Sequence, residues 1–231
     1  MCGRYTLAAP DPAAIRDRFP VGESVEIRRR FNVAPGDDVL AVTTDRAGAP
    51  RGELLHWGLV PPWAKSPEMG LKTINARLET ITERPTFRGA FARYRCLILA
   101  DGFYEWQRLG GGSKQPFHIT RRDAQPFAFA GLWSIWHRPD GGTMRSCTII
   151  TRAANSAIAG LHDRMPIILG RSDEREWLEA ATAGARLDQI LAGLPAGETE
   201  LRPVCRAVND ARYDGPECLA PPAEEPQRAL F

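Results

Sequence analysis

The residue best suited to chemistry stands second in the chain, in the opening segment MCGRYTL. If Met1 is removed, Cys2 becomes the N-terminal residue and carries an α-amine and a β-thiol on adjacent carbon atoms. The ordinary pKa values of these groups are about 7.7–8.0 and about 8.5, so both are partly deprotonated near neutral pH. A plainer interpretation is that a small residue happens to follow the initiator methionine. The opening seven residues taken alone favour that plainer interpretation.

Three further segments hold side chains that could transfer protons or bind anions. FYEWQ places Glu105 between two aromatic residues, where an apolar pocket would raise its pKa, although an outward-facing position on an alternating strand fits equally well. LHDRMPIIL places His162 and then Arg164 at a helix-to-strand junction, a common position for catalytic residues and also for a capping or core histidine. TINARLET places Asn75 and Arg77 on one face of an extended segment, which is catalytic in one interpretation and an exposed polar strand in the other.

Aromatic and basic residues allow, but do not require, a nucleic-acid partner. Trp57 and Trp63 flank a proline break in HWGLVPPW, and exposed tryptophans near arginines can stack on unpaired bases. Core packing is the other interpretation, and we expect it for at least one of the two. Only three of the 30 basic residues are lysines, and arginine binds phosphate in a bidentate way. Codon bias explains the bulk of this excess, and the net charge is only +2.

Several classes of protein are disfavoured by what the sequence lacks. It contains no G-x-S-x-G, H-E-x-x-H or EF-hand segment, and GGGSK lacks the residue order of a P-loop. The histidines and cysteines show no paired ligand spacing, so neither a metal site nor a cofactor is predicted. Five cysteines without a C-x-x-C argue against a disulfide framework. Cys96 and Cys147 begin apolar runs and are predicted to lie in the core, whereas no apolar run encloses Cys2.

The elements that must position these residues are mainly strands. Apolar and β-branched runs predict strands at 39–44, 54–60, 96–100, 117–120, 127–133 and 147–151, and spacing or capping predicts helices at 11–19, 86–95, 153–161 and 172–181. The order lacks regular β-α-β alternation, so we predict an α+β fold. It is a single strand-rich domain of mixed or antiparallel, barrel-like sheets with flanking helices. Residues 220–231, rich in proline and glutamate, are predicted to form a disordered tail. Without a signal peptide or an apolar run that spans a membrane, the protein is expected in the cytoplasm.

Ten segments together are more specific than any single motif. They occur in the order MCGRY, FNVAPG, HWGLVPPWA, INARLET, FRGAF, RCLILADGFYEW, AGLW, CTIITRAAN, HDRMPIIL and VNDARYDGPECL. In these segments the chain resembles the SOS response-associated peptidase family, also called the SRAP domain, over residues 2–219. The resemblance implies recognition of abasic sites in single-stranded DNA and a covalent link through the N-terminal cysteine. One departure is visible, because Leu78 stands where the family often has serine.

The resemblance also assigns roles to individual residues. It implies that Cys2, Asn75, Glu105 and His162 are catalytic: the cysteine forms a Schiff base and then a thiazolidine, Glu105 shuttles protons, Asn75 orients the amine and His162 opens the sugar ring. The residues expected to contact DNA are Gly3, Arg4, Trp57, Trp63, Arg77, Arg84, Trp106 and Arg164. No cofactor and no membrane partner are expected, and the protein is expected to be a monomer.

Two other functions remain open from the sequence. A cysteine peptidase could use Cys2 with His162 as base and Asn75 as orienting group, although the peptidase in the family's name can also describe only self-removal of Met1. A non-covalent module for single-stranded DNA could use the arginines and tryptophans as its binding platform. Only the covalent function leaves an adduct that survives denaturation.

Overall fold

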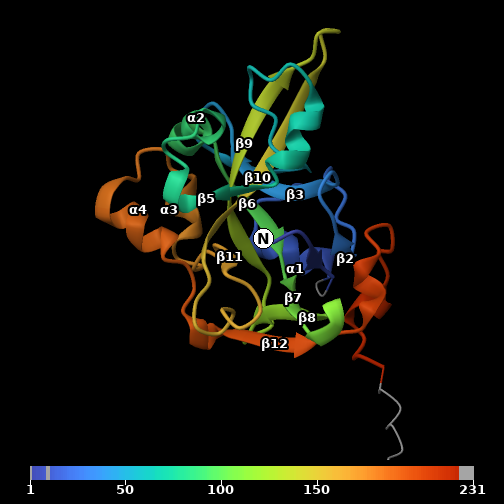
Figure 1. The fold of residues 1–231 in the computed structure, drawn as a ribbon. Coiled ribbons are helices and arrows are strands. Elements are labelled where there is room, and N and C mark those ends of the chain that lie inside the picture. Colours follow the sequence, from blue (N-terminus) through green and yellow to red (C-terminus); the bar gives the residue numbers. More distant parts are fainter. Residues whose placement is uncertain (1, 9–10, 224–231) are drawn as a thin grey trace, which may run out of the picture.

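The computed structural model describes residues 2–8 and 11–223 (Figure 1). The described residues form twelve strands, β1 (Tyr5–Leu7), β2 (Arg30–Val33), β3 (Asp38–Thr44), β4 (Pro50–Trp57), β5 (Asn75–Arg77), β6 (Arg95–Ala100), β7 (Gly102–Arg108), β8 (Lys114–Arg121), β9 (Phe127–His137), β10 (Thr143–Ala153), β11 (Arg164–Pro166) and β12 (Thr199–Pro203). Their α-helices are α1 (Pro12–Arg18), α2 (Pro85–Arg93), α3 (Glu174–Leu178) and α4 (Gly184–Leu191). Short 3₁₀ helices cover Pro67–Lys72, Leu78–Thr80, Gly110–Gly112, Ala196–Glu198, Arg206–Asn209 and Pro216–Leu219.

Five strands close into a barrel. The ring runs β10-β4-β3-β6-β9 and returns to β10, because β9 and β10 also pair with each other. The β10–β4 pair is parallel and the other pairs of the ring are antiparallel. β9 and β10 extend beyond the ring as a long hairpin, at the top of Figure 1. The predicted strand-rich α+β class with mixed, barrel-like sheets is therefore confirmed.

A second, antiparallel sheet packs against the barrel. Its order is β12-β8-β7-β1-β2, and β1 joins β7 with Tyr5 opposite Phe103. The aromatic side chains of Tyr5 and Phe103 both contact Phe129 of β9 edge-on, with ring centroids 5.6 Å and 6.1 Å apart, respectively. Aromatic pairs of this geometry add to the stabilisation from burial itself. The packing fixes β1, near the start of the chain, against the barrel.

The helices cover another side of the barrel. Ile15 of α1, Phe87 of α2, Trp177 of α3 and Ile190 of α4 belong to one buried cluster with Leu97 of β6. The helices α2, α3 and α4 lie together at the left of Figure 1. They confirm the prediction of flanking helices, and Leu7 of β1 and Ala76 of β5 pack in the same cluster.

Two predicted helices differ in the structure. Residues 153–161 do not form a helix, because β10 continues to Ala153 and residues 156–161 form turns. The side-chain oxygen of Asn155 accepts the backbone N–H groups of Ala157 and Ile158, at 3.1 and 3.3 Å, and so caps the start of these turns. The helix predicted at 172–181 is the shorter α3, and its N-cap residue is Asp173 rather than Ser172.

β4 ends at Trp57 and not at residue 60, because Gly58 takes a positive φ of 142°. Its Cα lies against the backbone of Gly70, where a Cβ would be only 2.7 Å from the carbonyl oxygen.

Of the predicted tail, residues 224–231 lie outside the described residues, and 220–223 form neither helix nor strand. None of the described helices has both the length and the apolar character needed to cross a membrane.

Candidate active site

Cys2 is buried in the unprocessed chain. Its side chain has 0% exposure and packs in the cluster that contains Trp57, Ile149 and Met165. Burial raises the pKa of the Cys2 thiol, and the nearby negative charge of Glu105 raises it further. No local apolar run encloses Cys2 in the sequence, but strands distant in the sequence enclose it in space. The site therefore holds a neutral thiol beside a carboxyl group.

Asn75 fixes the position of Cys2. β5 is extended and parallel to β10, with Asn75 opposite Ile149 and with Ala76 buried between Asn75 and Arg77. The Asn75 Nδ2 atom donates a hydrogen bond of 2.7 Å to the carbonyl oxygen of Cys2. The Asn75 Oδ1 atom is buried and accepts no hydrogen bond from the residues that the structure describes. The amide that holds Cys2 through Nδ2 thus has an acceptor available on its other atom.

Glu105 is buried, not outward-facing. It lies on β7 opposite Phe117 of β8 and is only 2% exposed, and its neighbour Tyr104 is 0% exposed. The alternating-strand interpretation is wrong because β7 is covered on both faces near its start. Burial raises the pKa of Glu105 to about 7, and the charge of Asp163 contributes to the rise. A carboxyl group with this pKa can give or take a proton at neutral pH.

His162 lies in the loop directly before β11. The backbone N–H of Arg164 donates to its Nδ1 atom at 2.9 Å, and a carboxylate oxygen of Asp163 lies 2.8 Å from the same atom. Nδ1 can accept from Arg164 only without a proton and can donate to Asp163 only with one. Burial lowers the pKa of His162, which favours the neutral ring and the bond from Arg164. In that form the proton sits on Nε2.

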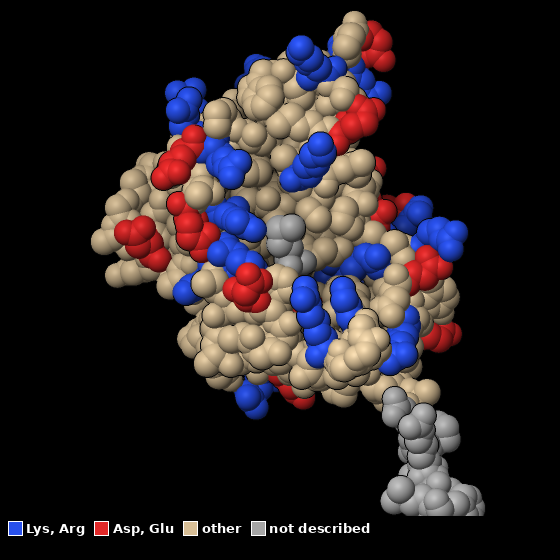
Figure 2. All heavy atoms as spheres, viewed as in Figure 1, with Lys and Arg blue, Asp and Glu red and all other residues tan. Residues whose placement is uncertain are grey.

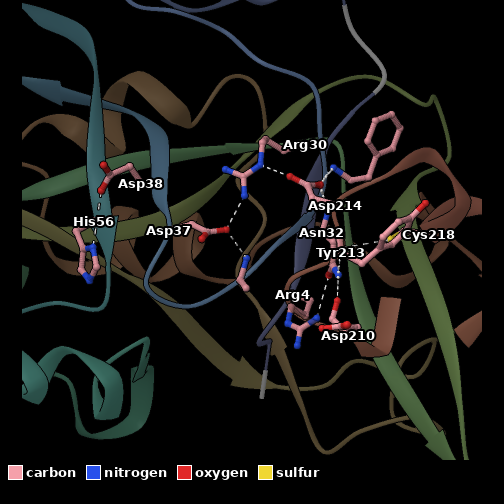
Figure 3. A network of polar contacts seen from close by, with 12 residues as sticks. Arg4, Arg30, Asn32, Asp37, Asp38, His56, Asp210, Tyr213, Asp214 and Cys218 are labelled. Carbon is pink, nitrogen blue, oxygen red and sulfur yellow. Dashed lines mark hydrogen bonds and ion pairs between the residues drawn. The ribbon is translucent and has the colours of Figure 1, made fainter. Parts of the chain in front are cut away.

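Arg4 anchors the backbone two residues after Cys2. Its Nη1 atom donates to the side-chain oxygen of Asn32 at 3.0 Å and to the carbonyl of Val208 at 2.8 Å (Figure 3). The Nδ2 atom of Asn32 in turn donates to the carbonyls of Asp210 at 2.9 Å and Tyr213 at 2.7 Å. These hydrogen bonds join the N-terminal segment to residues 208–213, near the C-terminal end of the described residues.

Comparison with known proteins identifies the chain. The sequence profile of the family described as SOS response associated peptidase (SRAP) matches residues 1–211. The chain belongs to the SRAP family. It is 41% identical over 225 residues to "Abasic site processing protein YoaM" of Bacillus subtilis, covering 95% of this chain and 97% of the relative. It is 39% identical over 223 residues to "Abasic site processing protein YoqW" of the same species, covering 95% and 99%. A crystal structure of a protein from Bacteroides thetaiotaomicron shares the fold, with a TM-score of 0.81 at 23% identity over 96% of this chain and 100% of that one.

The tryptophans of this SRAP chain have different environments. Trp57 is 1% exposed and its ring N–H donates to the carbonyl of Ile74 at 2.9 Å, so the prediction that it contacts DNA is wrong. It is the core tryptophan of the pair. Trp63 is 57% exposed, and half-buried Trp106 donates its ring N–H to Asn209 at 2.7 Å. Their contacts with DNA stay predictions.

The predicted DNA-binding arginines also divide into two groups. Arg77 and Arg84 are exposed, and their side chains form no hydrogen bond or ion pair within the described part of the chain. Arg164 is only 12% exposed and is bonded to Glu79, while Gly3 is half-buried. Lys and Arg side chains gather round the middle of the face seen in Figure 2, with acidic side chains among them on one side. The DNA contacts of these residues and of Arg4 stay predictions.

Reasoning from single motifs missed three residues with a place in the site. Asn32 and Asp163 contact Arg4 and His162, and Glu79 contacts Arg164. The segments FNVAPG, HDRMPIIL and INARLET contain these residues. The family resemblance therefore covered them, but it did not indicate which residues they contact. Among the described residues, no group of three or more His, Cys, Asp or Glu is arranged to hold a metal ion.

Proposed function

We propose that this SRAP protein recognises abasic sites in single-stranded DNA and binds them covalently through Cys2 after Met1 has been removed. The observation that carries the proposal is the 2.7 Å hydrogen bond from Asn75 to the Cys2 carbonyl, beside the buried carboxyl group of Glu105. An N-terminal residue is ordinarily loose, so a fixed one needs a reason. YoaM and YoqW are named abasic site processing proteins, which supports the class of substrate.

The aminothiol of a processed Cys2 suits an aldehyde. An abasic deoxyribose interconverts between a closed hemiacetal and an open aldehyde. The amine adds to C1′ and loses water to give a Schiff base; the sulfur then adds to C1′ while the thiol proton passes to the nitrogen. The resulting thiazolidine has no iminium to acidify the neighbouring C–H bond, so β-elimination and strand cleavage are suppressed. The reaction is covalent catalysis that stops at the adduct.

Glu105 supplies and removes the protons in this sequence. With a pKa of about 7 it is present in both forms at neutral pH. Its acid form protonates the hydroxyl group that leaves the carbinolamine as water. Its base form takes the proton from the attacking amine. Groups in this role accelerate reactions by roughly 10²–10⁴-fold.

His162 and Asn75 prepare the two reactants. A neutral His162 with its proton on Nε2 can donate that proton to the ring oxygen of the sugar and so open the hemiacetal. Asn75 holds the Cys2 carbonyl through Nδ2, and its Oδ1 is available to accept an N–H of the processed amine. These contacts orient the amine lone pair toward C1′.

The exposed residues provide a platform without sequence preference. Arg77 and Arg84 are accessible to phosphates, and Trp63 presents a ring on which a base can stack. Because the lesion has no base, its selection rests on shape and on the aldehyde.

Thiolate peptidase chemistry is less well supported. Catalytic cysteines of that kind lie where the pKa of the thiol is lowered. Burial and the charge of Glu105 instead raise the pKa of the Cys2 thiol. We therefore limit the proposed peptide cleavage to the removal of Met1.

A denaturing gel tests the proposal. The wild-type protein is incubated with an oligonucleotide that carries one abasic site, with the intact oligonucleotide and with a peptide library. We expect a heat-stable adduct with the abasic strand alone, lost in Cys2→Ala and retained in Cys205→Ala, which removes a cysteine from the C-terminal segment. Retardation only on native gels would support the non-covalent module, and cleaved peptides without an adduct would support the peptidase.

A further inference from the structure

Two short strands bring the candidate catalytic residues to the same part of β10. Thr151 of β10 lies opposite Arg77 on β5 and also opposite Pro166 on β11. Asn75 therefore lies on one side of β10, and the loop that carries His162 leads into the strand on its other side.

Glu79 connects the outer strands through Arg164. Glu79 lies in the 3₁₀ helix Leu78–Thr80, directly after β5. The Arg164 Nη1 and Nη2 atoms donate to its two carboxylate oxygens at 2.6 and 2.9 Å, and Nη2 also donates to the carbonyl of Thr151 at 2.7 Å. The backbone N–H of the same Arg164 donates to Nδ1 of His162 at 2.9 Å. One arginine thus joins all three strands to the imidazole ring.

We propose that Glu79 is a positioning residue for His162 in the crosslinking reaction, an inference that rests on the proposed function. Glu79 fixes the Arg164 side chain, and the backbone of Arg164 fixes Nδ1 of His162 and thereby aims Nε2. The residues before His162 form turns rather than a helix, so no helix sets the direction of the ring.

The environment of Arg164 makes this dependence strong. Its side chain is 12% exposed, and its Nε atom is buried without a hydrogen-bond partner among the described residues. The two terminal nitrogens carry the bonds that hold the guanidinium. Bidentate pairing with a carboxylate fixes the plane of this group as well as its position. The hydrogen bond from Arg164 lowers the pKa of Glu79, which keeps the carboxylate charged.

Two simpler roles make different predictions. A partly exposed ion pair without a positioning role contributes little to stability and nothing to the rate of chemistry. A carboxylate that merely occupies Arg164 would compete with a DNA phosphate, and its removal would tighten DNA binding. Rate, affinity and ring geometry therefore have to be measured separately.

The test compares wild type with Glu79→Gln and Glu79→Ala, and with Glu83→Gln, which removes an exposed carboxylate close by in the chain. Single-turnover crosslinking is measured at saturating abasic oligonucleotide, and Kd is measured with the intact oligonucleotide. NMR of the His162 ring nitrogens follows its tautomer and pKa without any crosslinking. Displacement of a reacting group by about 1 Å can cost on the order of 10²-fold, so we expect Glu79→Ala to be roughly 10- to 100-fold slower.

Glu79→Gln retains one hydrogen bond to Arg164, so its crosslinking rate should fall less than that of Glu79→Ala. The Kd should be unchanged and the His162 signals should shift in both Glu79 variants. Glu83→Gln should behave like wild type in all three measurements. Wild-type rates in Glu79→Ala, or unshifted His162 signals in a folded variant, overturn the inference. Tighter DNA binding with a faster reaction overturns it in favour of competition. If Glu79→Ala does not fold, Glu79→Gln decides by the same criteria. If the wild type forms no adduct, the proposed function fails, whereas the NMR comparison still tests whether Glu79 positions His162.

Discussion

Replacing Glu105 with glutamine should make the protein more stable at neutral pH while slowing its reaction. Burial raises the pKa of Glu105 from 4.5 to about 7. At 1.36 kcal/mol for each unit, this rise corresponds to about 3 kcal/mol. The folded state binds this proton more tightly than the unfolded state does. The stability from the protonated carboxyl group is therefore complete below pH 4.5 and is lost as the pH rises through about 7.

Glutamine keeps the shape of the protonated side chain and does not titrate. The free energy of unfolding of Glu105→Gln should therefore match that of wild type near pH 4.5 and exceed it by about 3 kcal/mol above pH 7. Urea unfolding of both proteins at intervals from pH 4.5 to 8 measures the difference, and Glu83→Gln corrects for the loss of one exposed charge. Single-turnover crosslinking should fall by roughly 10²–10⁴-fold in the same variant. A stability difference that does not change with pH would refute the account of Glu105, as would wild-type crosslinking rates at every pH.

Three further predictions concern the reaction and the DNA contacts. Intact-mass measurement should find Met1 absent from the mature protein, and retention of Met1 would leave Cys2 without the α-amine that the mechanism needs. Cys2→Ser should still form a Schiff base that borohydride traps, but its adduct should be less stable and accompanied by more strand cleavage; an adduct as heat-stable as that of wild type would rule out ring closure by the thiol. Arg77→Ala should weaken binding to intact and abasic single strands alike and reduce the slope of log K against log salt by about 1, and an unchanged slope would remove Arg77 from the phosphate contacts.

The barrel strands were readable from the sequence because burial on both faces leaves a local trace. The runs at 39–44, 96–100, 127–133 and 147–151 all lie within barrel strands. β1, β5 and β11 have three residues each, too few to show a period, and they are strands only because β7 or β10 pairs with them. Local pattern alone therefore could not define them.

The site shows the same division. The motifs named Cys2, Asn75, Glu105 and His162, but the burial of Glu105 depends on the sheet and the N-terminal segment that cover β7. The sequence predicted that one tryptophan of the pair lies in the core. The structure shows which one, because Trp57 is 1% exposed at the end of β4 and Trp63, beyond the turn at Gly58, is 57% exposed. The ion pair between Glu79 and Arg164 joins segments 85 residues apart and leaves no local signal.

The central claim is that Cys2 closes a thiazolidine on the abasic sugar, and mass spectrometry of the digested adduct tests it most directly. The adduct should map to an N-terminal peptide that begins at Cys2, with the mass of peptide plus sugar remnant minus one water. The Schiff base is an isomer of the thiazolidine, so the adduct is also treated with borohydride and with iodoacetamide. The thiazolidine should resist both reagents, since it has neither an imine nor a free thiol. An adduct on a lysine, or an adduct at Cys2 that is reduced and alkylated, would contradict the account.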